Sequence, residues 1–450
     1  MPTPIRIRLR LLRACALVLV SACAGGEPPN GPRAQAPPSI LLISIDTLRA
    51  DRVGCYGYGR DTTPFLDRLA QDSILYEHVQ SPAPYTLISH MTMLTGLHPR
   101  QHGVLREGLA LAPTFPTLAE RLHERGYQTA ALFFPGWIDD RFGFDRGFDL
   151  FEAHSDAEHA GEHFDEWLDQ VDPERPYFLF LHLFDVHSGP LNGGTAPLYD
   201  SPAPFDRLFL ADAPERLAGL DRRDIWTTPG LLDQAQIEAV GAMYDGGIRY
   251  VDSKLEAWLG QLDGRGLLEE TLVVVTSDHG ESLALRDGQM SGHGGVFQDG
   301  LHVPLLLRLP GGERGGTRVT DTAGLVDLAP TILAAVGLDF DEGLPGRSLL
   351  EAESGAASVY NAQHAGLDVL VQWPWKLVVA DEADAAFNLD LDPGEVAPIF
   401  SVLTMNLEQR LEDAYQSGLG TSPASLSPIA GADASSDELE KLHLLGYLDE

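Results

Sequence analysis

The sequence predicts an α/β fold: a central, mostly parallel sheet flanked by helices, followed by a small C-terminal antiparallel subdomain. The first observation is a set of short segments that are apolar almost throughout, which is typical of strands buried on both faces of a parallel sheet. They are Ser39–Ile45, Gln128–Phe134, Tyr177–Phe184, Leu272–Thr276 and Val303–Leu309. The second observation is that segments with helix signals lie between most of them, as in folds that cover a parallel sheet with helices. At 450 residues the chain is long enough for one large domain and a smaller one.

The helix signals can be taken in chain order. Thr63-Pro64 begins the first expected helix, because proline suits a first turn, and the helix runs through Ser73. A short strand near 74–78 and a short helix over 84–96 follow, and Gly96 ends that helix. The remaining expected helices are 117–125, 155–170, 231–262 with a break near Gly246-Gly247, and 324–336.

The character of the sequence changes after Gly346. Short segments there resemble antiparallel strands, and one more helix is expected close to the end of the sequence. The strands are 359–363, 369–373 and 376–379, and the helix is 435–445. We therefore expect a main domain over 39–345 and a C-terminal subdomain over 346–450.

The net charge limits the classes of function. The chain has 66 acidic and 31 basic residues, which gives a formal net charge of −35. Nucleic-acid binding needs a basic face, so we expect no nucleic-acid partner. The three cysteines, Cys15, Cys23 and Cys55, do not make the paired pattern of a disulfide framework.

The N-terminus predicts export. Four arginines precede a short apolar run over 14–20, as in a signal peptide, and this run is too short to span a bilayer. Small residues stand directly before Cys23, which resembles a bacterial lipobox, and in such signals the cysteine is lipidated. We expect residues 1–22 to be a signal peptide, residues 23–38 a lipidated tether, and the protein to be anchored in the bacterial cell envelope, at the outer membrane. An ordinary secretory signal is the alternative.

Polar residues follow three of the expected strands at their carboxyl ends. Asp46 follows the first strand, Asp185 and His187 follow the third, and Asp278 and His279 follow the fourth. Parallel strands end at one edge of a sheet, where open α/β sheets bind ligands. Carboxylate and imidazole groups suit a hard or borderline divalent cation. The sequence therefore predicts a metal site at this edge.

Thr86 lies near the start of the short helix over 84–96. Free backbone N–H groups and the positive end of the helix dipole favour an anion there. A metal that also contacts the hydroxyl would make it more acidic and so a better nucleophile. The alternative is that Thr86 is an ordinary N-cap residue.

These residues belong to a larger set of motifs. The set is Asp46-Thr47-Leu48-Arg49-Ala50-Asp51, Gly54-Cys55-Tyr56-Gly57, Leu94-Thr95-Gly96-Leu97-His98-Pro99, His102-Gly103-Val104, Asp185-Val186-His187, Ser277-Asp278-His279-Gly280-Glu281, His293-Gly294, Val303-Pro304-Leu305 and Asp392-Pro393-Gly394-Glu395. Together they resemble the sulfatase family of the alkaline phosphatase superfamily, over residues 39–450. The resemblance implies a metal-dependent hydrolase of sulfate or phosphate esters with a fold of the class above. It implies that Asp46, Thr86, Asp278 and His279 bind a divalent metal (Ca, Mg, Mn or Zn), that Thr86 is the nucleophile and that His187 contacts the ester.

The sequence departs from this family at the nucleophile. Sulfatases convert the first residue of a Cys/Ser-x-Pro-x-Arg motif to formylglycine, whereas residues 86–90 read Thr-Leu-Ile-Ser-His, so no formylglycine is expected. The second hydroxyl of hydrated formylglycine lets the enzyme expel sulfate. An unmodified threonine would stay sulfated, but water can attack a phosphothreonine at phosphorus. The family's second acidic ligand is replaced by Thr47, and its lysine after the His-Gly pair by Gln298. These departures favour phosphorus esters.

Other residues of the motifs are candidates for contacts to the ester. The candidates for its oxygens are Arg49, Arg106, His90 and His187. Asp185 and His293, with His187, are candidates for a second metal or a further oxyanion contact. The expected substrate is a small-molecule, lipid or glycan ester, and residues 188–230 are the expected lid over it.

Two other functions remain open. One is a genuine sulfuric ester hydrolase in which Thr86 only binds metal and water is the nucleophile. The other is a lipid-anchored protein that binds the metal without turnover. The presence of Asp46, Asp278 and His279 argues against simple decay of a site.

Overall fold

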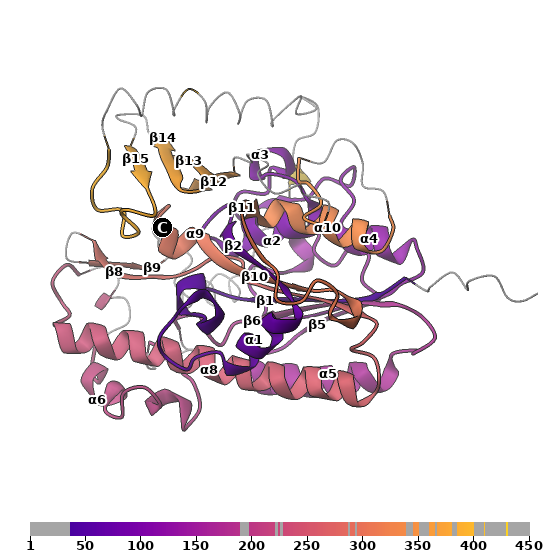
Figure 1. The fold of residues 1–450 in the computed structure, drawn as a ribbon, viewed down its shortest axis with the longest axis horizontal. Coiled ribbons are helices and arrows are strands. Elements are labelled where there is room, and N and C mark those ends of the chain that lie inside the picture. Colours follow the sequence, from indigo (N-terminus) through magenta and orange to yellow (C-terminus); the bar gives the residue numbers. More distant parts are fainter. Residues whose placement is uncertain are drawn as a thin grey trace, which may run out of the picture. The chain divides into compact units, whose positions relative to one another are not determined.

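An eight-stranded sheet forms the centre of the computed structural model, in the order β11-β2-β10-β7-β1-β6-β4-β5 (Figure 1). Its strands are β1 (Ser39–Ile45), β2 (Ile74–Gln80), β4 (Gln128–Phe133), β5 (Leu150–Ala153), β6 (Tyr177–Leu183), β7 (Thr271–Thr276), β10 (His302–Arg308) and β11 (Arg318–Gly324). β1 is parallel to both of its neighbours, β6 and β7, and the β4–β5, β4–β6 and β2–β11 pairs are also parallel. β10 is antiparallel to β2 and β7. The expected mostly parallel sheet is confirmed, with one reversed strand.

The structure describes most of the chain after residue 36. The described residues are 37–189, 198–220, 224–225, 228–286, 289–292, 295–338, 345–350, 360–364, 367–379, 385–399, 409 and 429–430. The expected signal peptide, Cys23, the helix over 435–445 and His293 lie outside them. Among the described residues, no helix is both long enough and apolar enough to cross a bilayer.

β1 shows why this sequence makes a two-sided sheet. Successive side chains of a strand point to opposite faces. Leu41, Ile43 and Ile45 belong to one buried apolar cluster, and Ile40 and Leu42 belong to another. An apolar run therefore has to be covered by helices on both sides, which is the reason that it predicted a parallel sheet.

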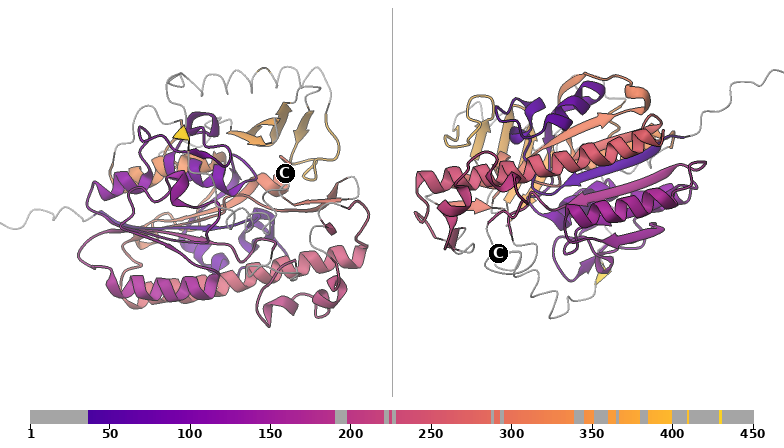
Figure 2. Two further views of the ribbon diagram at one scale, coloured as in Figure 1. Left: turned by 180° about the vertical axis from the view of Figure 1, so that it is seen from behind. Right: turned by 90° about the horizontal axis from the view of Figure 1, so that it is seen from below.

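Helices cover the two faces of the sheet. One cluster packs against α1 (Pro64–Leu69), α5 (Ala157–Gln170) and α8 (Gln234–Gly264), and α8 lies across this face in the view from below (Figure 2). The other packs against α2 (Thr86–Thr95), α4 (Leu118–His123) and α10 (Leu328–Ala335). In the described part of the chain the other short α-helices are α3 (Pro99–His102), α6 (Ala213–Leu217) and α9 (Gln298–Leu301). Two small pairings complete the main body: β8 (Ser282–Arg286) with β9 (Gln289–Gly292), and β3 (Leu109–Ala110) with β16 (Ile429–Ala430).

The expected break near Gly246-Gly247 is wrong, because α8 is one continuous helix of 31 residues. The glycines serve close packing instead. A Cβ atom on Gly246 would lie 2.3 Å from the carbonyl oxygen of Phe205, and one on Gly247 would lie 3.0 Å from that of Asp185. Glycine's low helix propensity suggested a break, but tertiary packing outweighs it here.

The C-terminal region contains a separate antiparallel sheet, as expected. Its order is β12-β13-β14-β15, with β12 at Tyr360–His364, β13 at Leu367–Gln372, β14 at Trp375–Val379 and β15 at Ala385–Asn388. Val369, Val371 and Phe387 of this sheet pack with Val296 and Leu301. The boundary at 345/346 stays a prediction.

Candidate metal centre

Three acidic and imidazole side chains meet at the carboxyl edge of the central strands. Asp46 follows β1, and Asp278 and His279 follow β7; all three are fully buried. One ligand atom from each lies within 4.8 Å of the others. β1 and β7 are adjacent and parallel, so this proximity is a direct result of the sheet topology.

The unpaired atoms of this group fit a cation. Asp46 Oδ1 and Asp278 Oδ2 are buried and have no hydrogen-bond partner in the described part of the chain. His279 Nδ1 donates to the carbonyl oxygen of Gly280 over 2.9 Å, so its Nε2 carries the lone pair. This nitrogen is 3.4 Å from Asp278 Oδ2 and 3.8 Å from Asp46 Oδ1. A carboxylate oxygen left unpaired inside a protein is costly, and a bound divalent cation would remove that cost.

The electrostatics of the group lead to the same conclusion. Burial, together with the charge of Asp278, raises the pKa of Asp46 well above its usual value. Burial also acts to raise the pKa of Asp278, but the neighbouring histidines, led by His279, outweigh it and the pKa is lowered. For His279, burial lowers the pKa and the two carboxylates raise it, with a net increase. Two buried carboxylates in this proximity repel each other and favour a shared positive charge.

Thr86 completes the group from the other side. It is the first residue of α2 and is buried. Its Oγ1 lies 3.3 Å from His279 Nε2 and 3.4 Å from Asp46 Oδ2. The N-cap interpretation of Thr86 is wrong, because the N-cap residue of α2 is Tyr85 and no side chain caps the helix there. The Thr86 hydroxyl is thus directed at the carboxylate–imidazole group.

Arg49, predicted to contact ester oxygens, is held by other groups. Its Nε and Nη2 donate to the Asp51 carboxylate over 2.8 and 2.7 Å, and its Nη1 donates to the carbonyl oxygen of Glu281 over 3.0 Å. Arg106 is exposed and donates to the carbonyl oxygen of Glu107. Neither arginine has a described hydrogen bond to Thr86 or Asp46.

Asp185 and His187 bind other residues and are not among the grouped ligand-type side chains. Asp185 Oδ1 accepts a hydrogen bond from Ala157 N, at the start of α5, over 3.0 Å, and burial raises the pKa of Asp185 to about 7. His187 is buried, stacks on Phe184 with ring centroids 4.1 Å apart, and donates from Nδ1 to the carbonyl oxygen of Ser188. Since His293 lies outside the described residues, the second-metal hypothesis stays a prediction.

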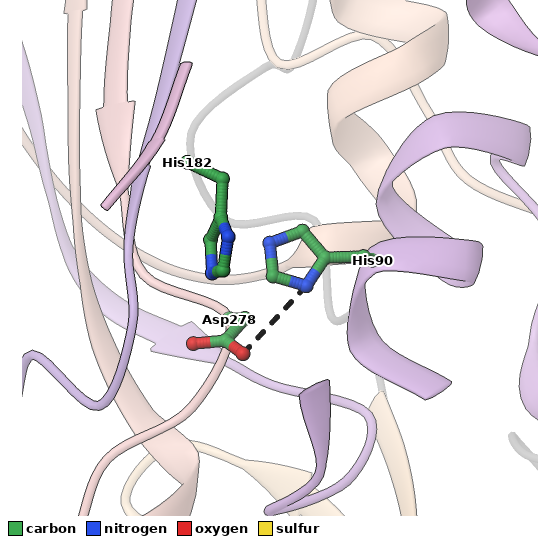
Figure 3. Close-up of side chains that lie close together, drawn as sticks. All are labelled: His90, His182 and Asp278. Carbon is green, nitrogen blue, oxygen red and sulfur yellow. Dashed lines mark ion pairs between the residues drawn. The ribbon is translucent and has the colours of Figure 1, made fainter. Parts of the chain in front are cut away.

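Two further histidines surround the carboxylates, and sequence reasoning missed one of them. His90, on α2, and His182, on β6, form with Asp278 a second group of ligand-type atoms, all buried (Figure 3). His182 Nε2 lies 3.2 Å from Asp46 Oδ2. The available signal was a single imidazole inside an otherwise apolar strand, directly opposite Ser44, a polar residue near the end of β1.

Gln298, which stands where the family has a lysine, is held by another side chain. Its side-chain amide forms a reciprocal pair with that of Gln80, over 3.1 and 3.2 Å. Both residues are buried. A neutral pair replaces the charge that a lysine would bring, so this side chain adds no cation to the site.

This chain is similar to known proteins over most of its length. A family model described as Sulfatase matches residues 38–338. Steryl-sulfatase of Mus musculus is 28% identical over 79% of this chain and 71% of its own length. An ulvan-active sulfatase of Formosa agariphila is 25% identical over 70% of this chain, and the match spans 64% of that protein, less than two thirds. Among solved structures, a phosphonate monoester hydrolase of Agrobacterium radiobacter aligns with a TM-score of 0.70 and 20% identity, covering 88% of this chain and 100% of that one.

Proposed function

Because the chain belongs to the sulfatase family, we propose that it is a metal-dependent ester hydrolase in which Thr86 is the nucleophile and phosphorus esters are the preferred substrates. The observation that carries this proposal is the position of Thr86 Oγ1, 3.3 Å from His279 Nε2 and 3.4 Å from Asp46 Oδ2. A hydroxyl at the start of a helix, beside the ligands of a cation, is where an activated nucleophile is expected.

The chain's own residues account for the steps. Asp46, Asp278 and His279 would hold a divalent cation, which when bound makes a contacting hydroxyl more acidic and offsets charge that develops on the ester oxygens. Thr86 Oγ1 attacks phosphorus and gives up its proton. The bond between phosphorus and the ester oxygen breaks, and the leaving group takes up one proton and departs as the alcohol. Water then attacks the phosphothreonine at phosphorus and restores the hydroxyl.

The side chain at position 86 supports phosphorus over sulfur. Threonine has no second hydroxyl with which to expel sulfate, and residues 86–90 lack the motif for formylglycine. Water can hydrolyse a phosphothreonine directly. One similar structure is that of a phosphonate monoester hydrolase. A small-molecule, lipid or glycan ester remains the proposed substrate class.

The test is a substrate panel. The purified chain, loaded in turn with Mn²⁺, Mg²⁺, Zn²⁺ or Ca²⁺, is assayed on an aryl phosphate, an aryl phosphodiester, an aryl phosphonate and an aryl sulfate. We expect turnover of a phosphorus ester that Thr86→Ala abolishes and Thr95→Ala, at the other end of the same helix, retains. Aryl sulfate hydrolysis that survives in Thr86→Ala would overturn the proposal.

Sulfate ester hydrolysis is the second candidate, and the similarity to steryl-sulfatase favours it. In that case Thr86 binds the cation and water attacks sulfur. The same panel separates the two functions. A third outcome, cation binding with no turnover of any ester, would instead identify a binding protein.

We also propose that the mature protein is anchored in the cell envelope through a lipid on Cys23. The support is the basic segment, the short apolar run and the small residues directly before this cysteine. Mass spectrometry of the mature N-terminus should find a lipidated Cys23 as the first residue. If wild type and Cys23→Ser both have an N-terminus without lipid, the proposal is contradicted.

A further inference from the structure

Two groups of buried ligand-type side chains share Asp278. One is Asp46, Asp278 and His279, and the other is His90, His182 and Asp278. Two such groups side by side suggest either a pair of cations, as in two-metal hydrolases, or a single cation with a supporting shell. The hydrogen bonds of each group distinguish these arrangements.

His90 is fully occupied as a hydrogen-bonding residue. Its Nδ1 lies 2.9 Å from the carbonyl oxygen of Thr86, and a carbonyl oxygen only accepts, so Nδ1 carries the proton. Its Nε2 is then the acceptor, and the hydroxyl of Ser44 donates to it over 2.9 Å. The protonated Nδ1 also lies 3.6 Å from Asp278 Oδ2, the pair joined by the dashed line in Figure 3. The nitrogen that faces the shared carboxylate therefore has no lone pair for a metal.

His182 contacts the carboxylate of Asp46. Its Nε2 lies 3.2 Å from Asp46 Oδ2, an acceptor, so this nitrogen donates. The rings of His90 and His182 meet edge to face, with centroids 4.8 Å apart. The two imidazoles thus pack against each other; His182 donates to the Asp46 carboxylate, and His90 donates to Thr86 O while lying close to Asp278.

The first group has the opposite character. Asp46 Oδ1 and Asp278 Oδ2 have no hydrogen-bond partner among the described residues, and the Nε2 lone pair of His279 faces them. The acceptors that need a positive charge lie on the His279 side of the carboxylates. His182 donates to the other oxygen of Asp46, Oδ2, and His90 Nδ1 is 3.6 Å from Asp278 Oδ2, beyond hydrogen-bond distance, so both unpartnered oxygens remain available to a cation.

We infer that this site takes one divalent cation, between Asp46, Asp278 and His279, and that two histidines are positioning residues: His182 holds Asp46 by N–H donation, and His90 holds the start of α2 by donating to Thr86 O beside the Asp278 carboxylate. His90 also links the nucleophile to the sheet, because it is hydrogen-bonded to Ser44 of β1 and to the backbone of Thr86 on α2. The inference rests on the proposed function only in requiring that a cation binds to the first group.

Conservative substitutions test it, because an asparagine amide can replace the Nδ1–H of histidine and a glutamine amide can replace the Nε2–H. Mn²⁺ binding is measured by equilibrium titration and electron paramagnetic resonance on the full chain. We expect one Mn²⁺ per chain with the spectrum of an isolated ion. His90→Asn and His182→Gln should keep that stoichiometry and an affinity within about threefold of wild type, whereas His90→Leu and His182→Leu should lose about 10- to 100-fold, as is typical of outer-shell partners.

The control is His102→Gln. His102 is also fully buried, but it bonds to Thr92 and Val104 rather than to the carboxylates, so Mn²⁺ affinity should not change. Thermal unfolding checks that each variant is folded. If a leucine variant does not fold, the His90→Asn and His182→Gln variants and the Mn²⁺ stoichiometry still test the inference.

Two results would overturn the inference. Two Mn²⁺ per chain with a spin-coupled spectrum, reduced to one by His90→Asn, would make His90 a ligand while leaving the proposed hydrolase intact. Wild-type protein that binds no Mn²⁺, Mg²⁺, Zn²⁺ or Ca²⁺ would overturn both the inference and the proposed function.

Discussion

The hydroxyl of Tyr244 donates a hydrogen bond to the carbonyl oxygen of Thr47 over 2.7 Å and accepts one from Arg49 N over 3.1 Å. Tyr244 is on α8 and is fully buried. Thr47 has a positive φ of 58°, a conformation that β-branched residues rarely adopt. Such a conformation costs on the order of 1–3 kcal/mol and persists only where the surroundings enforce it. Helix α8 therefore holds the turn that positions Asp46.

We expect Tyr244→Phe to weaken both the fold and the metal site. It removes two buried hydrogen bonds next to Asp46, so unfolding should require about 1–3 kcal/mol less free energy, and Mn²⁺ affinity should fall. Urea denaturation and Mn²⁺ titration measure the two effects. Tyr76→Phe is the control, since the buried hydroxyl of Tyr76 donates to Leu349 O, away from the site. It should lower stability without changing Mn²⁺ affinity, and an equal affinity loss in both variants would contradict the prediction.

Thr47→Asp should strengthen cation binding. Thr47 Oγ1 is buried without a hydrogen-bond partner in the described structure, and its backbone N donates to Asp278 Oδ1 over 3.3 Å. Asp tolerates a positive φ better than Thr does, and a third carboxylate would face the cation. A gain of at least about tenfold in Mn²⁺ affinity, roughly 1.4 kcal/mol, is expected by titration. Thr47→Asn has the same shape without the charge, and an equal gain there would show that relief of backbone strain is the cause.

A buried ion pair lies at the C-terminal sheet, and its lysine also donates to the loop after β9. Lys376 Nζ, on β14, binds the Glu395 carboxylate and the carbonyl oxygen of Val296, and all polar atoms of this pair are screened from solvent. Lys376→Met leaves a buried carboxylate unpaired and should cost about 3–5 kcal/mol of unfolding free energy. Lys376→Met/Glu395→Gln should recover much of that loss in urea denaturation. Arg68→Ala, which breaks a pair with Glu256 that is more than half exposed, should cost less than about 1 kcal/mol. A similar small cost for Lys376→Met would contradict the prediction.

The sheet and the centre of the site were accessible to sequence reasoning because both follow from strands. A segment that is apolar on both faces belongs inside a parallel sheet. The residues after β1 and β7 must then meet, because the two strands are neighbours. Asp46, Asp278 and His279 therefore lie together as predicted.

The other features of the site depend on the directions of side chains, which the positions of the strand ends do not predict. Asp185 also follows a central strand, but its carboxylate turns to the start of α5. His182 lies within a strand, where an apolar pattern reads as core, and its role depends on packing against His90 from a different element. The Gly246-Gly247 pair makes close contacts with Phe205 and Asp185. Long-range contacts of this kind cannot be read from local sequence.

The raised pKa of Asp185 predicts a pH-dependent stability. Burial raises this pKa from 3.8 to about 7 in the folded chain. Between these values the folded state binds the proton more tightly than the unfolded state does, so the stabilising contribution is present below about pH 4 and is lost as the pH rises to 7. The buried carboxylate then has to ionise, and its Oδ2 has no partner in the described structure.

Asp185→Asn removes this titration and keeps an oxygen for the N–H group of Ala157. The free energy of unfolding of the variant, relative to wild type, should therefore rise by about 3 kcal/mol between pH 5 and pH 8, from the 1.36 kcal/mol that each pKa unit represents. Urea denaturation of both proteins with a chelator present, at several pH values, gives this difference directly. Asp252→Asn provides a comparison, because burial raises the pKa of Asp252 only to about 6 and its carboxylate accepts from two N–H groups, of Phe65 and Leu66. Asp252→Asn should already be less stable than wild type at pH 5. If the difference in unfolding free energy between Asp185→Asn and wild type does not depend on pH, Asp185 does not titrate between pH 5 and pH 8.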